Sequence, residues 1–316
     1  MMTNGQQPKA APFRGVFAIP VTPFDADANL DEASLRRCVD FCVAAGAHGI
    51  VAPVNASEFF TLTETERKRV VEVVVEQAAG RRTVVAGVTG SSTQVAVEMA
   101  RHAASAGADS VMAMPPFVRH PGPDETVEFY TAVARAAGVP VWIQDFGPPM
   151  GTPMGPALLA RLLEIPGVDY VKEETALAPQ VMSQTKALAG DKVKGMMGGM
   201  AGRYLLDEYR RGATGTMPAC EVADAHVAVW NALESGDDTK AREMFRLLLP
   251  LLNIEAMYSF VVYKEVLYRR GIIANPKTRA PGAPTLDEPS SKELDQILRD
   301  LSPLLTAAPS GAAAVA

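Results

Sequence analysis

A lysine stands at the end of one of the most strand-like runs in the sequence. Residues 168–174 read VDYVKEE, which places Lys172 directly before Glu173 and Glu174. A protein interior disfavours an unpaired ammonium group so strongly that a buried lysine tends to lose its proton, and a neutral amine can attack a carbonyl carbon. Lys172 is therefore a candidate Schiff-base nucleophile. The segment alone favours a simpler interpretation, a strand-end lysine paired with one of the two glutamates.

The spacing of these residues indicates which carboxylate would act with the lysine. Side chains alternate along a β-strand, so Tyr170, Lys172 and Glu174 share one face if the strand extends that far. Val171 and Glu173 then point to the opposite face. We therefore expect Glu174 to lie beside Lys172.

The rest of the chain predicts the scaffold that positions this lysine. Short β-forming runs alternate with segments of helical period, and the predicted strands are 16–21, 49–53, 83–87, 110–114, 140–145, 168–172, 194–197 and 215–217. Helix-start signals stand between them at Asp31-Glu32, Thr63-Glu64-Thr65-Glu66 and Ser91-Ser92-Thr93. The junction from helix to strand recurs as AGAHG at 45–49, AGADS at 106–110 and RGATG at 211–215, where glycine allows a left-handed helix end.

Eight such units in about 220 residues predict an α/β protein with a (β/α)8 TIM barrel. We assign the barrel to 13–235, a C-terminal helical cap to 236–304, and flexible tails to 1–12 and 305–316. After residue 218 the pattern is entirely helical, with predicted helices at 222–234, 239–248, 251–270 and 290–301. We expect Pro250 to separate two of these helices or to kink one.

In such barrels the reacting groups stand at the C-terminal ends of the strands and in the loops that follow. This rule brings three further segments to the region of Lys172. They are Gln144 and Asp145 at the end of strand five, Asn55 to Glu58 after strand two, and Gly198-Gly199 after strand seven.

Composition excludes several classes of function. The chain has 316 residues, 48% of them hydrophobic, and a net charge of -6 without a long basic run, so neither nucleic acid nor an anionic membrane is an expected partner. Its three cysteines, Cys38, Cys42 and Cys220, are an odd number and predict reduced, buried thiols. No signal-peptide core or membrane span is apparent, so we expect a cytoplasmic protein.

No metal or cofactor site is expected. The four histidines show no ligand-type spacing, and the glycine-rich segment 195–202 lacks the tight pattern of a phosphate loop. A G-x-S-x-G nucleophile elbow is also absent from the sequence.

The chain resembles the dihydrodipicolinate synthase and N-acetylneuraminate lyase family from end to end. The resemblance rests on Val21-Thr22-Pro23-Phe24, segment 58–67, Lys172, Gly198-Gly199, segment 211–215, segment 264–271 and Arg279-Ala280-Pro281. It implies a Schiff base between Lys172 and a 2-oxo acid, and a homo-oligomer, commonly a tetramer. Together with the position of Lys172 it makes the nucleophile the favoured interpretation.

Departures from the family pattern indicate a particular branch. The usual G-[ST]-T-G-E loop is Val54-Asn55-Ala56-Ser57-Glu58 here, and the usual Y-N-x-P end of strand five is Gln144-Asp145-Phe146-Gly147. The arginine that the synthases need is missing, because none occurs between Arg135 and Arg161. Neither dihydrodipicolinate synthesis nor ordinary neuraminate cleavage is therefore expected.

The same segments look like the sugar-acid dehydratase branch, particularly the L-2-keto-3-deoxyarabonate type. This resemblance implies dehydration of a 2-keto-3-deoxy sugar acid, with Glu174 replacing the missing tyrosine in proton transfer. The implied catalytic residues are Lys172 and Glu174, and the implied substrate-binding residues are Asn55, Ala56, Ser57, Gln144, Asp145 and Gly199.

Two other functions stay open at this point. An aldolase or hydratase-aldolase of the same family would share the first half of the pathway, up to the enamine. A protein that binds a 2-oxo acid without turnover would have the same fold, because fold alone does not guarantee activity.

Overall fold

The computed structural model describes residues 13–307, and eight parallel strands there close into a barrel in chain order. The strands are β1 (Gly15–Ala18), β2 (Gly49–Ala52), β3 (Thr83–Gly87), β4 (Ser110–Ala113), β5 (Val141–Phe146), β6 (Val168–Glu174), β7 (Gly195–Gly198) and β8 (Gly215–Thr216). The predicted TIM barrel is confirmed. The predicted tail 1–12 and residues 308–316 lie outside the described residues.

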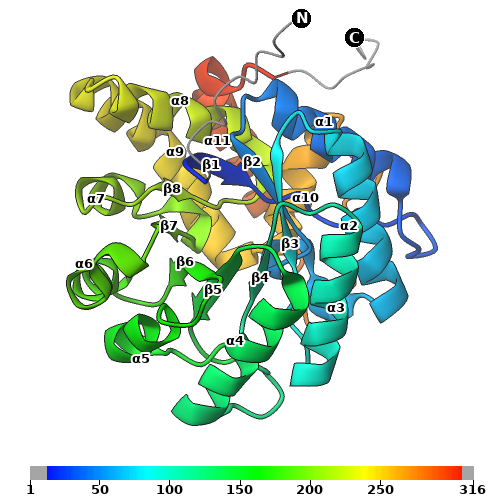
Figure 1. Cartoon of the computed structure of the whole chain (residues 1–316). Helices are drawn as coiled ribbons and strands as arrows, with labels where there is room; N and C mark the ends of the chain where they lie inside the picture. The colour runs from blue at the N-terminus through cyan, green and yellow to red at the C-terminus, as the bar shows by residue number, and fades with distance from the viewer. Residues whose placement is uncertain (1–12, 308–316) are drawn as a thin grey trace, which may run out of the picture.

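Helices connect the strands and surround the barrel, as Figure 1 shows. They are α1 (Glu32–Ala44), α2 (Glu64–Ala78), α3 (Thr93–Ser105), α4 (Pro123–Ala137), α5 (Gly155–Leu162), α6 (Ala178–Ala189), α7 (Leu205–Arg210) and α8 (Ala223–Glu234). Three further helices form the cap, α9 (Asp238–Tyr258), α10 (Phe260–Arg269) and α11 (Glu288–Leu301).

Local sequence signals start these helices where the sequence predicted. The side chains of Asp31 and Ser92 accept hydrogen bonds from the first turns of α1 and α3. Thr63 and Glu66 form a capping box at α2, in which each side chain binds the other residue's backbone amide. Gly107, in one of the recurring junctions, has a φ of 95°, a conformation that favours glycine.

Aromatic side chains fill the N-terminal half of the barrel interior. The rings of Trp142 and Tyr170 stack with their centroids 4.6 Å apart. Phe13 packs edge-on against both, at 5.5 Å and 4.8 Å. These three rings fill the barrel interior on the side away from the C-terminal ends of the strands.

The cap differs from its predicted form at one place. Pro250 lies inside α9 and does not separate two helices. The break falls at Ser259, which has a φ of 48° and ψ of -124° between α9 and α10. Buried contacts of Leu248 and Leu251 hold α9 together on either side of the proline, which offsets the one backbone hydrogen bond that a proline removes.

A buried ion pair ties the cap to the barrel. Glu58, after β2, and Lys264, on α10, are both fully buried, and their side chains form a salt bridge. The other carboxylate oxygen of Glu58 accepts hydrogen bonds from the backbone amides of Arg279 and Ala280, each at 3.0 Å. Glu58 therefore fixes both α10 and the segment that follows it.

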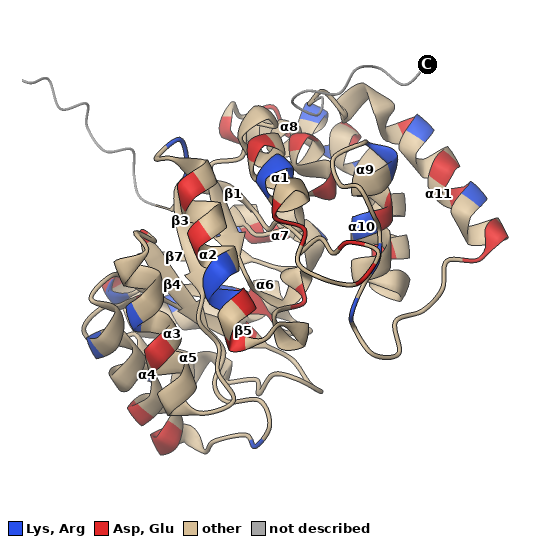
Figure 2. Cartoon of the chain, turned by 90° about the vertical axis from the view of Figure 1, so that its right-hand side faces the viewer, with Lys and Arg blue, Asp and Glu red and all other residues tan. Residues whose placement is uncertain are grey.

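The outer helices carry charges of both signs, and the cysteines are buried. Figure 2 shows basic and acidic residues interspersed along the outer helices. Cys38, Cys42 and Cys220 are free and buried, as predicted. None of the helices between residues 13 and 307 is long and apolar enough to cross a membrane. Ala307 is held by hydrogen bonds with Asp224 and Arg270, so the described part of the predicted tail 305–316 is anchored.

Candidate active site

Lys172 and Glu174 lie side by side at the C-terminal end of β6. The strand continues through Glu174, so the two side chains share a face, as alternation predicted. Nζ of Lys172 is 3.0 Å from Oε1 of Glu174, and the two side chains are only 2% and 8% exposed. Lys172 thus forms the strand-end ion pair that the sequence predicted, and its role as a nucleophile stays a prediction. A contact of this length is short enough for direct proton transfer.

The carboxylate of Glu174 is held from two other strands. Gln144 is the register partner of Lys172 on β5, and its Nε2 donates a 2.6 Å hydrogen bond to Oε2 of Glu174. Gly199, after β7, gives the carboxylate room, because a Cβ atom there would lie 2.2 Å from Cγ of Glu174. Three of the predicted residues, Gln144, Glu174 and Gly199, therefore meet around Lys172.

The structure does not bring Asp145 to this group. It pairs in register with Glu173, on the opposite face of the sheet from Lys172. Oδ1 of Asp145 accepts a 2.9 Å hydrogen bond from the amide of Met154, and the amide of Thr175 donates to Glu173 at 2.8 Å. Burial raises the pKa of Asp145, and burial and the Asp145 charge raise the pKa of Glu173 to about 8. These carboxyls lie between the barrel and its outer helices.

The predicted carboxylate-binding segment after β2 is a 3-10 turn, Asn55–Ser57. The first amides of a helical turn lack partners within the turn, which leaves the backbone N–H groups of Asn55 and Ala56 available to an anion. Both residues line a cavity. Ser57 is committed elsewhere, because its hydroxyl donates a 2.7 Å hydrogen bond to the carbonyl of Pro20.

The loop after β7 has an unusual backbone. Met200 and Ala201 are consecutive residues with positive φ, 50° and 57°. Left-handed conformations cost roughly 1 to 2 kcal/mol per non-glycine residue, and such strain concentrates at functional sites. Nε2 of His226 lies 3.0 Å from the carbonyl oxygen of Ala201 and helps to hold the loop in this form.

Two cavities open at this end of the barrel and share the side chains of Phe146 and Met200. One, of about 560 Å³, reaches Glu174. The other, of about 460 Å³, extends from Asn55 and Ala56 to the cap. Volumes of this size are typical of small-molecule sites.

Four polar residues of the second cavity were missed by the sequence reasoning. They are Arg203 after β7, Glu255 on α9, Ser259 between α9 and α10, and Tyr263 on α10. They come together only because the cap folds over the barrel. A local motif could not have revealed them, although Glu255 inside an apolar helical run was a visible anomaly.

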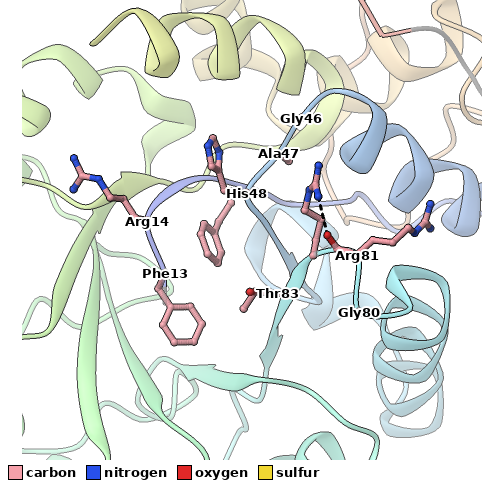
Figure 3. Close-up of a pocket in the computed structure, with 10 residues that line it drawn as sticks. Phe13, Arg14, Gly46, Ala47, His48, Gly80, Arg81 and Thr83 are labelled. Carbon is pink, nitrogen blue, oxygen red and sulfur yellow. Dashed lines mark hydrogen bonds between the residues drawn. The ribbon is translucent and has the colours of Figure 1, made fainter. Parts of the chain in front are cut away.

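A further cavity, of about 450 Å³, lies at the opposite end of the barrel (Figure 3). Its lining comes from the segments before β1, β2 and β3 and from residues of β1 and β3, and it includes His48. Two of its arginines are neutralised within the chain, Arg14 by Glu234 at 2.5 Å and Arg81 by Asp40 at 2.6 Å. Since barrel chemistry occurs at the C-terminal ends of strands, we assign the active site to the end that holds Lys172.

A metal is not supported by the arrangement of side chains. Within residues 13–307, no group of three or more histidine, cysteine, aspartate or glutamate side chains is placed to hold an ion.

Fold and site together define a closed (β/α)8 barrel with a buried lysine–carboxylate pair at the end of its sixth strand. Residues 12–301 match the family described as the Dihydrodipicolinate synthetase family. The chain belongs to this family of Schiff-base-forming lyases.

Individual relatives carry different names. The chain is 34% identical to an L-2-keto-3-deoxyarabonate dehydratase of Azospirillum brasilense, over 96% of this chain and 98% of that one. It is also 34% identical to a 4-hydroxy-tetrahydrodipicolinate synthase of Methanothrix thermoacetophila, over 92% and 98%. Among solved structures, a putative dihydrodipicolinate synthetase from Pseudomonas aeruginosa superposes with a TM-score of 0.86 at 27% identity, over 92% and 99% of the two chains.

Proposed function

We propose that the protein dehydrates a 2-keto-3-deoxy sugar acid of the L-2-keto-3-deoxyarabonate type through a Schiff base on Lys172. The observation that carries this proposal is the Lys172–Glu174–Gln144 arrangement, in which a carboxylate occupies the place of an acid–base group beside the nucleophile. Similarity to a dehydratase of this substrate over nearly the full length supports it.

The reaction begins with attack by the neutral amine of Lys172 on the C2 carbonyl carbon. Glu174 can accept the ammonium proton across the 3.0 Å contact and so free the amine. Glu174 returns this proton to the hydroxyl of the resulting carbinolamine, which leaves as water and gives an iminium, whose positive nitrogen acidifies the C3 hydrogen. The backbone amides of Asn55 and Ala56 hold the substrate carboxylate during these steps.

Glu174 then removes the C3 proton, and the electron pair forms an enamine. The enamine expels the C4 hydroxyl, which takes up a proton from Glu174 and leaves as water. Further proton shifts and hydrolysis of the iminium release the dehydrated oxo acid and restore Lys172. A well-placed general acid or base contributes roughly 10²–10⁴-fold to such a reaction.

Gln144 fixes Glu174 for both transfers. Its 2.6 Å hydrogen bond to Oε2 leaves Oε1 directed at Lys172. A residue locked by its neighbours loses little freedom when the transition state forms, which is the advantage of preorganisation.

A turnover screen across 2-keto-3-deoxy pentonates, hexonates and glucarates, with product masses recorded, tests the proposal. We expect a dehydrated oxo acid without release of pyruvate. Release of pyruvate would indicate the aldolase reaction instead. Binding of pyruvate without turnover of any sugar acid would indicate a protein that only binds 2-oxo acids.

A further inference from the structure

We propose that Glu255 binds a hydroxyl at the far end of the substrate and selects acids whose far end is uncharged. This inference rests on the proposed function and names the substrate class more narrowly. It concerns the cavity of about 460 Å³ between the turn at Asn55 and the cap helices α9 and α10.

Glu255 is an unsatisfied buried group that faces this cavity. The residue is 2% exposed and lines the cavity wall. Neither of its carboxyl oxygens receives a hydrogen bond from any residue within 13–307. Buried polar groups without partners are rare and costly in folded proteins. A substrate hydroxyl in the cavity would supply the missing partner.

A second buried carboxyl, that of Glu221, interacts with Glu255. Glu221 lies in the short turn Cys220–Val222 that follows β8, is fully buried, and also lacks a hydrogen-bond donor among the described residues. Burial raises the pKa of Glu221 to about 7, and burial and the Glu221 charge raise that of Glu255 well above its usual range. The two carboxyls act on each other as a pair that holds one proton and carries one negative charge. One shared proton leaves an oxygen of Glu255 without a partner, and this oxygen can accept a hydrogen bond from a substrate hydroxyl.

The position of the cavity relative to the reacting end agrees with this role. The cavity begins at Asn55 and Ala56, the proposed carboxylate anchor, and shares Phe146 and Met200 with the cavity that reaches Glu174. A substrate whose carboxylate is held at Asn55 and Ala56 would lie in the cavity whose wall includes Glu255.

The charges of the cavity discriminate between substrate classes. A terminal carboxylate would meet Glu255, which shares one negative charge with Glu221, and like charges in a desolvated site cost several kcal/mol. Arg203 is the positive group of the lining, and its charge already acts on Glu255, so it is offset by the carboxyl pair and is not left free for a further carboxylate. We therefore expect 2-keto-3-deoxy pentonates and hexonates to react in preference to glucarate-type dicarboxylates.

The test compares substrates in the full-length variant Glu255→Gln. We measure kcat/KM for a pentonate and for a dicarboxylate, together with the borohydride-trapped pyruvate adduct on Lys172. Pyruvate has no far end, so its adduct should form as in the wild type. The preference for the pentonate should fall about 10-fold or more, because the charge discrimination and a buried hydrogen bond are lost.

Glu208→Gln is the matched control. Glu208 is also a buried carboxyl without a donor within residues 13–307, but it does not line this cavity. Its variant should leave the ratio of the two substrates unchanged. An equal change of the ratio in both variants would overturn the proposal, since it would mark a general effect of losing a buried carboxyl.

A second variant decides the matter if Glu255→Gln does not fold. Ala256 lines the same cavity from an exposed position on α9, and Ala256→Leu keeps a strong helix former there. It should impair turnover of the sugar acids while the pyruvate adduct forms normally. Unchanged turnover in Ala256→Leu, or an unchanged ratio in a folded Glu255→Gln, would overturn the inference. Absence of the adduct in the wild type would overturn the proposed function instead.

Discussion

Nζ of Lys172 and Oε1 of Glu174 lie 3.0 Å apart because the two residues are separated by one residue on the same strand. The period of two places them on one face of β6. At the C-terminal end of a barrel strand that face is the site of chemistry. One short sequence, K-x-E, thus provides both a nucleophile and a proton acceptor.

Replacing Glu174 with glutamine should slow turnover more than it alters binding. Glutamine keeps the shape of the side chain but cannot accept a proton, so we expect kcat to fall by roughly 10²–10⁴-fold. Glu173→Gln is the matched control, because Glu173 points to the opposite face of β6. Steady-state kinetics check both variants. A Glu174→Gln rate within a few-fold of wild type would remove Glu174 from the acid–base role.

Replacing Gln144 with leucine should lower kcat/KM about 10-fold. The variant loses the 2.6 Å hydrogen bond that holds Glu174, and a hydrogen bond to a charged group contributes about 1.5 to 3 kcal/mol. The effect should disappear in a Glu174→Gln background, because Gln144 acts through that carboxylate. A double-mutant cycle measures this coupling. Additive effects of the two substitutions would show that Gln144 acts on the substrate directly.

Breaking the buried pair between barrel and cap should destabilise the fold. Glu58→Gln leaves Lys264 buried without its counter-charge, which typically costs 3 to 5 kcal/mol. The control is Glu66→Gln, which breaks a partly exposed pair with Arg279 and should cost less than about 1 kcal/mol. Urea unfolding curves give both values. Equal losses in the two variants would contradict the structural role of Glu58.

Glu208 should make stability depend on pH. Burial, then the charges of Asp207 and Glu174, raise its pKa to about 8 from a usual value of 4.5. The native state keeps a proton that the unfolded chain releases, so its stabilising contribution is complete below about pH 4.5 and declines as the pH rises to about 8. Glutamine has no such proton. The melting temperature of Glu208→Gln relative to wild type should therefore rise between pH 5 and pH 8, and a constant difference would refute this explanation.

Local signals made much of the fold predictable. Strand alternation, helix caps such as Thr63 and junction glycines such as Gly107 act over a few residues, and all eight strands lie where these signals placed them. The same alternation predicted the contact of Lys172 with Glu174. It also separates Gln144 from Asp145, because neighbours on a strand face opposite ways, and the structure places only Gln144 beside Glu174.

The position of the cap over the barrel depends on long-range packing, and the sequence did not predict it. Glu255 faces the barrel mouth only because α9 folds over it, and no local rule predicts that docking. The helix break at Ser259 depends on the same packing. At Pro250, local propensity predicted a break or kink, but buried leucines on either side keep the helix continuous.

Borohydride reduction in the presence of pyruvate tests the central claim most directly. The wild-type protein should gain the mass of one reduced pyruvate, and peptide mapping should place the adduct on Lys172. Lys172→Arg should show no adduct, because a guanidinium cannot form the Schiff base. A wild-type protein without an adduct, or an adduct on another lysine, would contradict the account.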